Sequence, residues 1–336
     1  MQDKTKICIC GGGHIAHSLA AVLSDDGEPV YVYTRNPQLW GSSLMYEKGA
    51  AHVLHKSKGR LSVSNDVGII RDCNCIVIAL PRFAIEEVLV KLDPVLHEGQ
   101  TVVFIPAPSD MEKVVEKLAI RGIDTLGFQR VPYVARTISY GHSVWISDVR
   151  NEHKIAFSRG GIVGKWGRFF ESKLGGRVVE LSSFLSFTFS NSNPLLHPAR
   201  LVELLKGGDC GKYDRCPLFY AEWTDASSEL YVKADEEMFA VFRAYAPEYA
   251  MSDYESVFDH YEVSSSHALT QKIRTISSLK NILAPWVQIG DKWEPDYKSR
   301  YFTEDIPFGT KMIQRYAKKV GIAVPTIDYM IESCQH

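Results

Sequence analysis

The glycine-rich stretch near the start of the chain has the spacing of a phosphate-binding turn. Gly11, Gly13 and Ala16 form the pattern G-x-G-x-x-A directly after a short apolar run. In such a turn the first glycine permits a tight bend, the second lets the backbone approach a pyrophosphate, and the small third residue lets the helix pack closely on the strand. The phosphates would meet the backbone N–H groups that open the helix, at His14 and Ile15. We therefore predict a bound dinucleotide here.

Three residues after the next expected strand bear on which dinucleotide binds. An NAD site usually places Asp or Glu at this point to bind the ribose hydroxyls, whereas this chain has Thr34, Arg35 and Asn36. A guanidinium pairs bidentately with the extra phosphate of NADP, and Thr34 or Asn36 can donate to it as well. We predict NADP, with NAD as the alternative. Alternatively, Arg35 is a surface arginine that plays no role in selecting the cofactor.

A histidine lies between two prolines in the segment 191–198. Pro194 and Pro198 restrict the backbone on either side of His197, and Pro198 suits the first position of a helix. An imidazole that is neutral near pH 7 can give or take a proton, and the reduction of a carbonyl or an imine requires such a transfer as hydride arrives. We predict that His197 performs it. The alternative is a histidine that caps a helix or fills the core.

The segment 300–309, R-Y-F-T-E-D-I-P-F-G, combines an arginine, an aromatic pair, two adjacent acids and a proline. Glu304 and Asp305 are either solvated or begin a helix at Pro307, where acids favour the helix dipole. The functional alternative is that a carboxylate from this segment meets His197 and fixes its tautomer. Arg300 would then bind a substrate carboxylate through its planar fork.

These two segments, together with the glycine turn, resemble the opine dehydrogenase family of the octopine and nopaline type. The family joins an N-terminal Rossmann domain to an α-helical domain, and its H-P and R-Y-x-x-E-D-x-P-x-G segments are similar to 193–198 and 300–309. Its members condense an amino acid with an α-keto acid and reduce the resulting imine with NAD(P)H. The resemblance implies an NADP-dependent opine dehydrogenase with small-molecule substrates.

The resemblance also implies roles for individual residues. His197 would be the catalytic acid/base and Asp305 its carboxylate partner, while Arg300 and Asn193 would bind substrate. After an expected strand the family tends to carry P-G-x-x-G near the nicotinamide, whereas this chain has P-A-P-S-D at 106–110. The contacts on the nicotinamide side are therefore not carried over.

Two other functions remain open at this stage. An NADP-linked ketoacid or hydroxyacid dehydrogenase resembling ketopantoate reductase also joins a Rossmann domain to a helical one. It would need a lysine as acid, and Lys206, Lys272 and Lys280 are available without a distinctive context. A redox-sensing NADP-binding protein would bind the cofactor without turnover.

Alternating strands and helices in the first half must position the glycine turn. Apolar runs predict parallel strands, and 3.6-residue periodicity predicts helices between them. We expect strands at 7–10, 29–33, 75–80, 101–105, 125–128 and 177–181, with helices at 40–51, 83–92, 111–120 and 166–174. We also expect a hairpin at 55–63 around Gly59 and an antiparallel pair of 144–147 with 154–157.

The pattern becomes mainly helical from about residue 184. We expect helices at 198–205, 228–244, 263–269, 310–320 and 326–333. The predicted fold class is therefore α/β, with a Rossmann doubly wound parallel sheet over 1–185 and an all-α domain over 186–336.

Composition excludes several classes of protein. The net charge is −2 among 336 residues, so no basic field favours nucleic acid. No run approaches the ~20 apolar residues of a membrane span and no signal segment is visible, so we expect a cytoplasmic protein that binds no membrane. The seven cysteines lack a C-x-x-C step, so we expect no metal. A homodimer is compatible with this composition.

Overall fold

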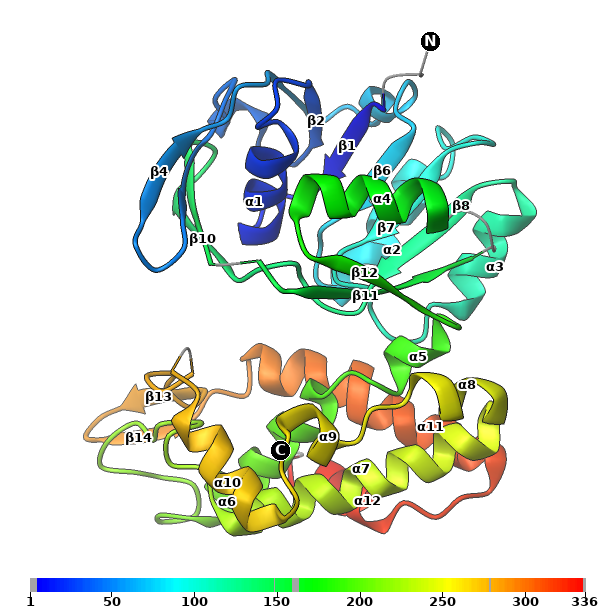
Figure 1. Ribbon diagram of the computed structural model, residues 1–336. Helices are drawn as coiled ribbons and strands as arrows, with labels where there is room; N and C mark the ends of the chain where they lie inside the picture. The colour runs from blue at the N-terminus through cyan, green and yellow to red at the C-terminus, as the bar shows by residue number, and fades with distance from the viewer. Residues whose placement is uncertain (1–4, 148, 159–162, 278, 335–336) are drawn as a thin grey trace. The chain divides into compact units, whose positions relative to one another are not determined.

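The computed structural model describes residues 5–147, 149–158, 163–277 and 279–334 (Figure 1). The chain divides into two compact units, Met1–Phe187 and Thr188–His336. The division predicted after residue 185 lies close to this boundary. The first unit is a Rossmann-type α/β fold and the second is mainly helical, which confirms the predicted fold class.

An eight-stranded sheet forms the centre of the first unit (Figure 1). Its strands are, in spatial order, β12 (Arg177–Leu181), β11 (Glu152–Phe157), β8 (Asp124–Phe128), β7 (Thr101–Phe104), β6 (Cys75–Ile78), β1 (Ile7–Cys10), β2 (Val30–Tyr33) and β5 (Leu61–Ser64). Neighbouring strands are parallel except β11, which runs antiparallel to β8. The six strands predicted for this sheet are confirmed, with small shifts at their ends.

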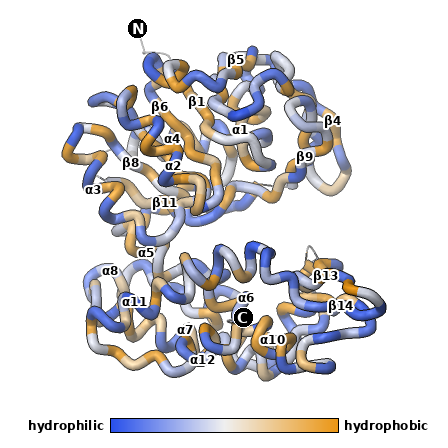
Figure 2. The backbone as a smooth tube through the Cα atoms, turned by 180° about the vertical axis from the view of Figure 1, so that it is seen from behind, coloured by the Kyte–Doolittle hydropathy of each residue, from blue (hydrophilic) through white to orange (hydrophobic). Residues whose placement is uncertain are grey.

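Helices cover both faces of this sheet because its central strands carry apolar residues on both sides. On one face Ile7 and Ile9 pack in a core with α1 (His14–Leu23) and α4 (Val163–Leu174). On the other face Cys8 and Cys10 pack with α2 (Arg82–Leu92) and α3 (Glu112–Ile120). All residues of β1 and β6 are buried, and these strands are largely orange in Figure 2. This two-sided burial is typical of a doubly wound parallel sheet.

The strand order reverses beside β1. From β1 the chain builds β2 and β5 on one side. It then returns to the other side of β1 to form β6. Ligands of open α/β sheets bind outside the carboxyl ends of the strands at such a point. The glycine turn follows the carboxyl end of β1, so the topology places it where a dinucleotide is expected.

A second, four-stranded sheet corrects the helix predicted over 40–51. The sheet has the order β4-β3-β10-β9, with β3 (Met45–Lys48), β4 (Val53–Lys56), β9 (Ala135–Ser139) and β10 (Ser143–Ile146). The predicted helix is wrong because β3 pairs with β10 on one side and with β4 on the other. The distant partner β10 lies almost a hundred positions away, where helical periodicity carries no information, so tertiary pairing decides the conformation.

The two antiparallel pairs predicted within this unit are also wrong. Strand β4 belongs to the four-stranded sheet, whereas β5 joins β2 in the large sheet, so 55–63 is a crossing between sheets rather than a hairpin. Similarly, β10 pairs with β3 and β9, whereas β11 pairs with β8 and β12. Two 3₁₀ turns, η1 (Pro37–Leu39) and η2 (Val67–Ile70), complete the connections.

The second unit is built mainly from helices. They are α6 (Asn193–Lys206), α7 (Asp225–Tyr245), α8 (Pro247–Asp253), α9 (Val257–Tyr261), α10 (Ser266–Thr275), the π-helical segment η3 (Tyr301–Thr310), α11 (Lys311–Val320) and α12 (Pro325–Ser333), and the short α5 (Leu185–Thr188) precedes them across the boundary. Helix α6 packs against η3, α7 and α12. A hairpin of β13 (Trp286–Ile289) and β14 (Lys292–Pro295) was not expected.

Three general findings concern the residues that the structure describes. All seven cysteines are free thiols, and six of them are buried. No group of three or more His, Cys, Asp or Glu side chains in these residues is placed to hold a metal ion. None of the described helices is both long enough and apolar enough to cross a membrane.

Candidate functional site

The two motif glycines after β1 serve different structural purposes. Gly11 has a φ of +148°, and a Cβ atom there would lie 2.6 Å from the carbonyl oxygen of Ala79 after β6. Gly11 is therefore needed for the fold itself. Gly13 caps α1 in an extended conformation, and a Cβ atom there would meet nothing within 4 Å. The space above Gly13 is open, as a site for a pyrophosphate requires.

The amino end of α1 is open to an anion. Gly13 and His14 are exposed, Ile15 is half-buried, and no side chain caps the helix. The His14 ring is turned toward β9, where its Nδ1 accepts a hydrogen bond from the Thr137 N–H at 2.9 Å. Ala16 is fully buried, as close packing of the helix on the strand requires. The backbone N–H groups of this turn therefore fit a phosphate.

Two hydroxyl groups surround the middle glycine of the turn. A Cβ atom on Gly12 would lie 2.6 Å from Tyr140 Oη and 2.8 Å from Thr34 Oγ1. Thr34 is buried at the end of β2, and Tyr140 comes from the connection between β9 and β10. The backbone thus passes between two hydrogen-bonding groups, and a larger residue at Gly12 would fill this space.

His17 fixes the position of the glycine turn through hydrogen bonds of both its ring nitrogens. Its Nδ1–H donates to the carbonyl oxygen of Gly13 at 2.9 Å, and its Nε2 accepts from the N–H of Gly141 at 2.7 Å. The ring stacks on Trp40 with ring centres 4.1 Å apart. Burial lowers the pKa of His17, so this histidine is neutral and acts as a structural clamp.

The predicted cofactor contacts Thr34 and Arg35 follow β2 directly. Arg35 is exposed directly after the buried Thr34, and Asn36 precedes η1. No carboxylate occupies the positions 34–36, where an NAD site usually carries one. The first unit therefore fits a dinucleotide, with a guanidinium at the end that would meet the adenosine ribose.

The second unit contains the predicted histidine–aspartate pair. His197 Nδ1 lies 2.7 Å from Asp305 Oδ2, across 108 positions of sequence. An ionised carboxylate can only accept, so the proton is on Nδ1 and this nitrogen donates to Asp305. The side chain of His197 is 2% exposed and that of Asp305 is 16% exposed. The predicted contact is present, and the catalytic roles of both residues stay predictions.

The other ring nitrogen of His197 has a partner that the sequence did not indicate. Nε2 accepts a hydrogen bond from the hydroxyl of Tyr220 at 3.0 Å. The Tyr301 ring lies against the same imidazole, with ring centres 4.4 Å apart. Burial raises the pKa values of Tyr220 and Tyr301, so both phenols are protonated at neutral pH. No motif marks Tyr220, because it follows His197 by 23 positions outside any helix or strand.

Helix α6 begins earlier than predicted. Pro198 was expected at its first position, but the helix starts at Asn193, Pro194 lies in the first turn, and Pro198 lies inside. Because Pro198 has no N–H, it leaves the carbonyl oxygen of Pro194 without its usual helix partner. The Thr310 hydroxyl of η3 donates to this oxygen at 2.6 Å. The proline therefore connects the helix of His197 to the segment of Asp305.

Close approach of Gly309 completes this connection. A Cβ atom at Gly309 would lie 2.5 Å from Pro194 Cγ, so only glycine allows η3 and α6 to pack this tightly. Although the segment 300–309 carries an arginine and two acids, Phe302 and Ile306 are buried in η3. Wide π-helical turns often occur at functional sites because they redirect side chains. Here the wide turns direct Asp305 toward His197.

The remaining predicted site residues lie at the two helix starts. Arg300 is exposed at the beginning of η3, with its guanidinium carbon 5.7 Å from the centre of the Tyr301 ring. Glu304 is half-buried, and burial together with the nearby Asp305 raises its pKa. Asn193 opens α6, and its N–H donates to Asn191 Oδ1 at 3.2 Å. Arg300 is thus close to the His197 cluster through Tyr301, whereas the contact described for Asn193 is that of its backbone N–H with Asn191.

The lysines that a ketopantoate-reductase-like acid would require have other surroundings. Lys206 Nζ lies 4.8 Å from the centre of the Tyr329 ring. Lys272 Nζ lies 3.8 Å from Glu262 Oε2 at the surface. Lys280 is exposed. His197 therefore stays the predicted acid–base residue of the second unit.

Comparison with known proteins covers both units. Residues 180–336 match the family model of the NAD/NADP octopine/nopaline dehydrogenase α-helical domain, and residues 6–142 match the NAD-dependent glycerol-3-phosphate dehydrogenase N-terminus. Tauropine dehydrogenase of Arabella iricolor is 25% identical over 98% of this chain and 90% of its own length. The second unit belongs to the family of octopine/nopaline dehydrogenase α-helical domains. The similarity across both units makes the chain an NAD(P)-dependent oxidoreductase of the opine dehydrogenase type.

Other members of the opine dehydrogenase family agree with this assignment. Octopine dehydrogenase of Mizuhopecten yessoensis is 23% identical over 98% of this chain and 89% of its own length. A structure of octopine dehydrogenase with NADH and L-arginine has a TM-score of 0.84 at 22% identity, and covers 99% of this chain and 89% of that one. That likeness shows the shared fold.

Proposed function

We propose that the protein is an NADP-dependent opine dehydrogenase that reductively condenses an amino acid with an α-keto acid. The observation that carries the proposal is the hydrogen bond of 2.7 Å between His197 and Asp305 on segments that Thr310 and Gly309 hold together. It occurs in a chain whose first unit presents an open glycine turn at the switch point of a parallel sheet. We assign cofactor binding to residues 1–185 and substrate chemistry to 186–336.

His197 manages the proton of the reduction in this proposal. Reduction of an imine adds hydride to carbon and a proton to nitrogen, and a bound NADPH would supply the hydride. Asp305 holds the proton on Nδ1, which leaves Nε2 as the nitrogen that exchanges a proton. The carboxylate also stabilises the imidazolium form, so His197 can carry the proton that the substrate nitrogen receives.

Arg35 is the residue to which we assign the preference for NADP. Arg35→Ala should lower NADPH affinity by one to two factors of ten, because a charge-assisted hydrogen bond contributes about 1.5 to 3 kcal/mol. The dissociation constants of NADPH and NADH, measured by fluorescence titration, provide the comparison. NADH affinity should stay unchanged. Arg71→Ala is the control, because this exposed arginine precedes β6 at the amino ends of the strands. Equal affinity of the unmutated protein for both cofactors would contradict the assignment.

Arg300 is the residue to which we assign a substrate carboxylate. Arg300→Lys should raise KM for the keto acid or amino acid far more than it changes NADPH affinity, because an ammonium cannot reproduce the planar fork. Arg243→Lys is a matched control, since its guanidinium carbon also lies 5.7 Å from an aromatic ring centre, that of Phe239. An unchanged KM for every active substrate would assign Arg300 a structural role.

The proposed reaction is tested by requiring both substrates. NADPH oxidation is followed with a panel of α-keto acids, each with and without a panel of amino acids. Pyruvate and L-arginine belong in the panels because octopine dehydrogenase structures contain them. Turnover that needs both partners supports the opine reaction. Turnover with a keto acid alone selects the simpler ketoacid dehydrogenase, and NADPH binding without any turnover selects the redox sensor.

A further inference from the structure

Both ring nitrogens of His197 are occupied within the protein. Asp305 accepts from Nδ1 at 2.7 Å and Tyr220 donates to Nε2 at 3.0 Å, and the imidazole is 2% exposed. A proton that leaves this ring must therefore pass to one of these two partners. Transfer to the carboxylate would neutralise the group that stabilises the imidazolium. A phenol can accept a proton on its oxygen while releasing its own, so Tyr220 is the suitable route.

Tyr220 and Tyr301 both border the imidazole of His197, and Tyr301 also contacts Arg300. The Tyr220 hydroxyl is bonded to Nε2, the Tyr301 ring centre lies 4.4 Å from that of His197, and the Arg300 guanidinium carbon lies 5.7 Å from the Tyr301 ring centre. Tyr220 is 6% exposed and Tyr301 is half-buried, whereas Arg300 is exposed. The Tyr220 hydroxyl is therefore the partner of Nε2 in the same cluster as the residue to which we assign the substrate carboxylate.

We propose that Tyr220 is a catalytic residue that relays the proton between His197 and the substrate nitrogen. The proposal rests on the opine dehydrogenase reaction proposed above. Before transfer, the imidazolium Nε2–H donates to Tyr220 Oη, and the Tyr220 O–H donates to the imine nitrogen. As the hydride that a bound NADPH would supply adds to the imine carbon, the Tyr220 O–H bond breaks and a nitrogen–hydrogen bond forms. In the same step the Nε2–H bond of His197 breaks and its proton restores the Tyr220 hydroxyl. The product state is a neutral His197 that accepts from Tyr220, which is the arrangement observed.

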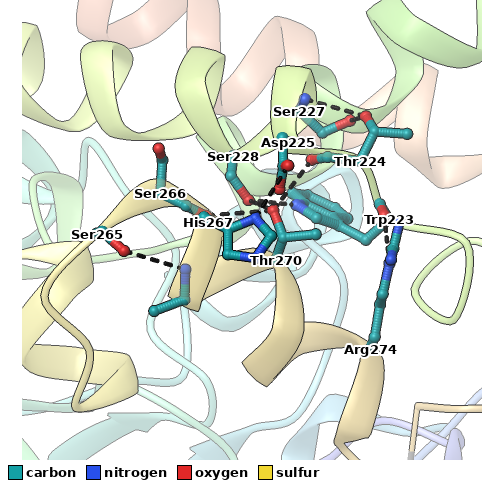
Figure 3. Close-up of polar contacts among 11 residues, drawn as sticks. Trp223, Thr224, Asp225, Ser227, Ser228, Ser265, Ser266, His267, Thr270 and Arg274 are labelled. Carbon is teal, nitrogen blue, oxygen red and sulfur yellow. Dashed lines mark hydrogen bonds and ion pairs between the residues drawn. The ribbon is translucent and has the colours of Figure 1, made fainter.

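Hydrogen bonds hold the backbone on both sides of Tyr220. The buried Arg200 of α6 donates through Nε to the carbonyl oxygen of Phe219 at 3.0 Å. At the other end, Arg274 Nε donates to the carbonyl oxygen of Trp223 at 2.6 Å, as Figure 3 shows. The indole N–H of Trp223 also donates to Ser228 Oγ at 2.9 Å (Figure 3). A fixed Tyr220 favours a relay over a side chain that opens to expose Nε2.

Two arginines thus act as positioning residues for the relay. Arg200 follows His197 by three positions on α6, so one helix carries both the imidazole and the group that fixes Phe219. Arg274 belongs to α10, which packs against α7 beside Trp223 (Figure 3). The hydrogen bonds among Thr224, Ser228 and Thr270 in this region are complete, which is consistent with a rigid support rather than a ligand site.

The decisive comparison is Tyr220→Phe with Tyr254→Phe. Tyr254 is a matched control because its hydroxyl donates to Asp235 at 2.6 Å and burial likewise raises its pKa, but it has no contact with His197 among the residues that the structure describes. Tyr220→Phe should lower the single-turnover rate of NADPH oxidation by ~10² or more, because it removes the group that transfers the proton. Tyr254→Phe should leave this rate unchanged, and both variants should bind NADPH normally by fluorescence titration.

The number of moving protons separates a relay from a structural hydroxyl. In mixtures of H₂O and D₂O, the unmutated protein should give a curved dependence of the single-turnover rate on deuterium fraction, because two protons move together. Tyr220→Phe should give a linear dependence. A linear dependence in the unmutated protein, or an unchanged rate in Tyr220→Phe, overturns the relay. The first of these measurements needs no variant, so it decides the question even if Tyr220→Phe does not fold.

Failure of the relay and failure of the proposed reaction give different results. If His197→Asn is inactive while Tyr220→Phe keeps the full rate, His197 exchanges its proton directly and the relay is wrong. If His197→Asn keeps the full rate, the acid–base assignment itself is wrong. The ¹⁵N chemical shifts of the His197 ring offer a readout without turnover, since loss of the Tyr220 hydroxyl should shift Nε2 but not Nδ1.

Discussion

His197→Asn should lower kcat by ~10²–10⁴ while NADPH affinity stays unchanged, because asparagine fills a similar space but cannot carry a proton between two nitrogens. Stopped-flow measurement of NADPH oxidation and fluorescence titration of NADPH test the two parts separately. His267→Asn is the matched control. His267 also contacts an aspartate, Asp225, at 3.1 Å, but its side chain is 70% exposed at the surface of the second unit.

The partner of His197 provides an internal check on this result. Asp305→Asn should also lower kcat, because an amide no longer selects the tautomer with the proton on Nδ1. The double variant should be little worse than His197→Asn alone, since the two residues act as one unit. If the two losses multiplied, the residues would contribute independently, and the hydrogen bond between them would have no catalytic importance.

Gly13→Val should abolish dinucleotide binding without loss of folding. The Cβ atom of a side chain at Gly13 would have no protein atom within 4 Å, so the protein can accommodate it. The side chain would, however, occupy the space that a pyrophosphate needs. Gly11→Ala should instead lower the stability of the fold. Its Cβ would lie 2.6 Å from the Ala79 carbonyl oxygen at a φ of +148°, and the resulting strain should lower the free energy of unfolding by about 1–3 kcal/mol.

The contrast between the two glycine variants is measured by thermal unfolding and by NADPH titration on the same preparations. A shift in melting temperature is expected for Gly11→Ala, and loss of the binding signal at an unchanged melting temperature is expected for Gly13→Val. Normal NADPH binding by a folded Gly13→Val would mean that the turn is only structural.

Sequence patterns predicted the elements whose burial is decided locally. The apolar runs of β1, β6 and β7 and the 3.6-residue periodicity of α2 and α3 carry their own signal, and these elements were predicted within a few residues. The residues 45–48 carried no such signal, because their conformation depends on pairing with β10. The same dependence on partners outside the local sequence explains why the two antiparallel strand pairs predicted in this unit are wrong.

In the acid–base site, too, only the residues marked by local sequence motifs could be predicted. His197 and Asp305 could be proposed because both lie in segments that resemble a known family. Tyr220 could not, because its importance follows from the folding of one loop onto α6, where Arg200 fixes Phe219. The role of Thr310 also depended on seeing the carbonyl oxygen that Pro198 leaves unpaired.

The four-stranded sheet has a consequence for how the protein acquires its cofactor site during synthesis. The glycine motif leaves the ribosome well before Tyr140 and Gly141, which contact Gly12 and His17. Strand β10 must close a loop on the order of a hundred residues to reach β3, and such long-range parallel pairing is slow. A nascent chain that ends before this strand carries the glycine motif and His17 without the groups of Tyr140 and Gly141 that contact them, so we expect the cofactor site to be completed late in translation.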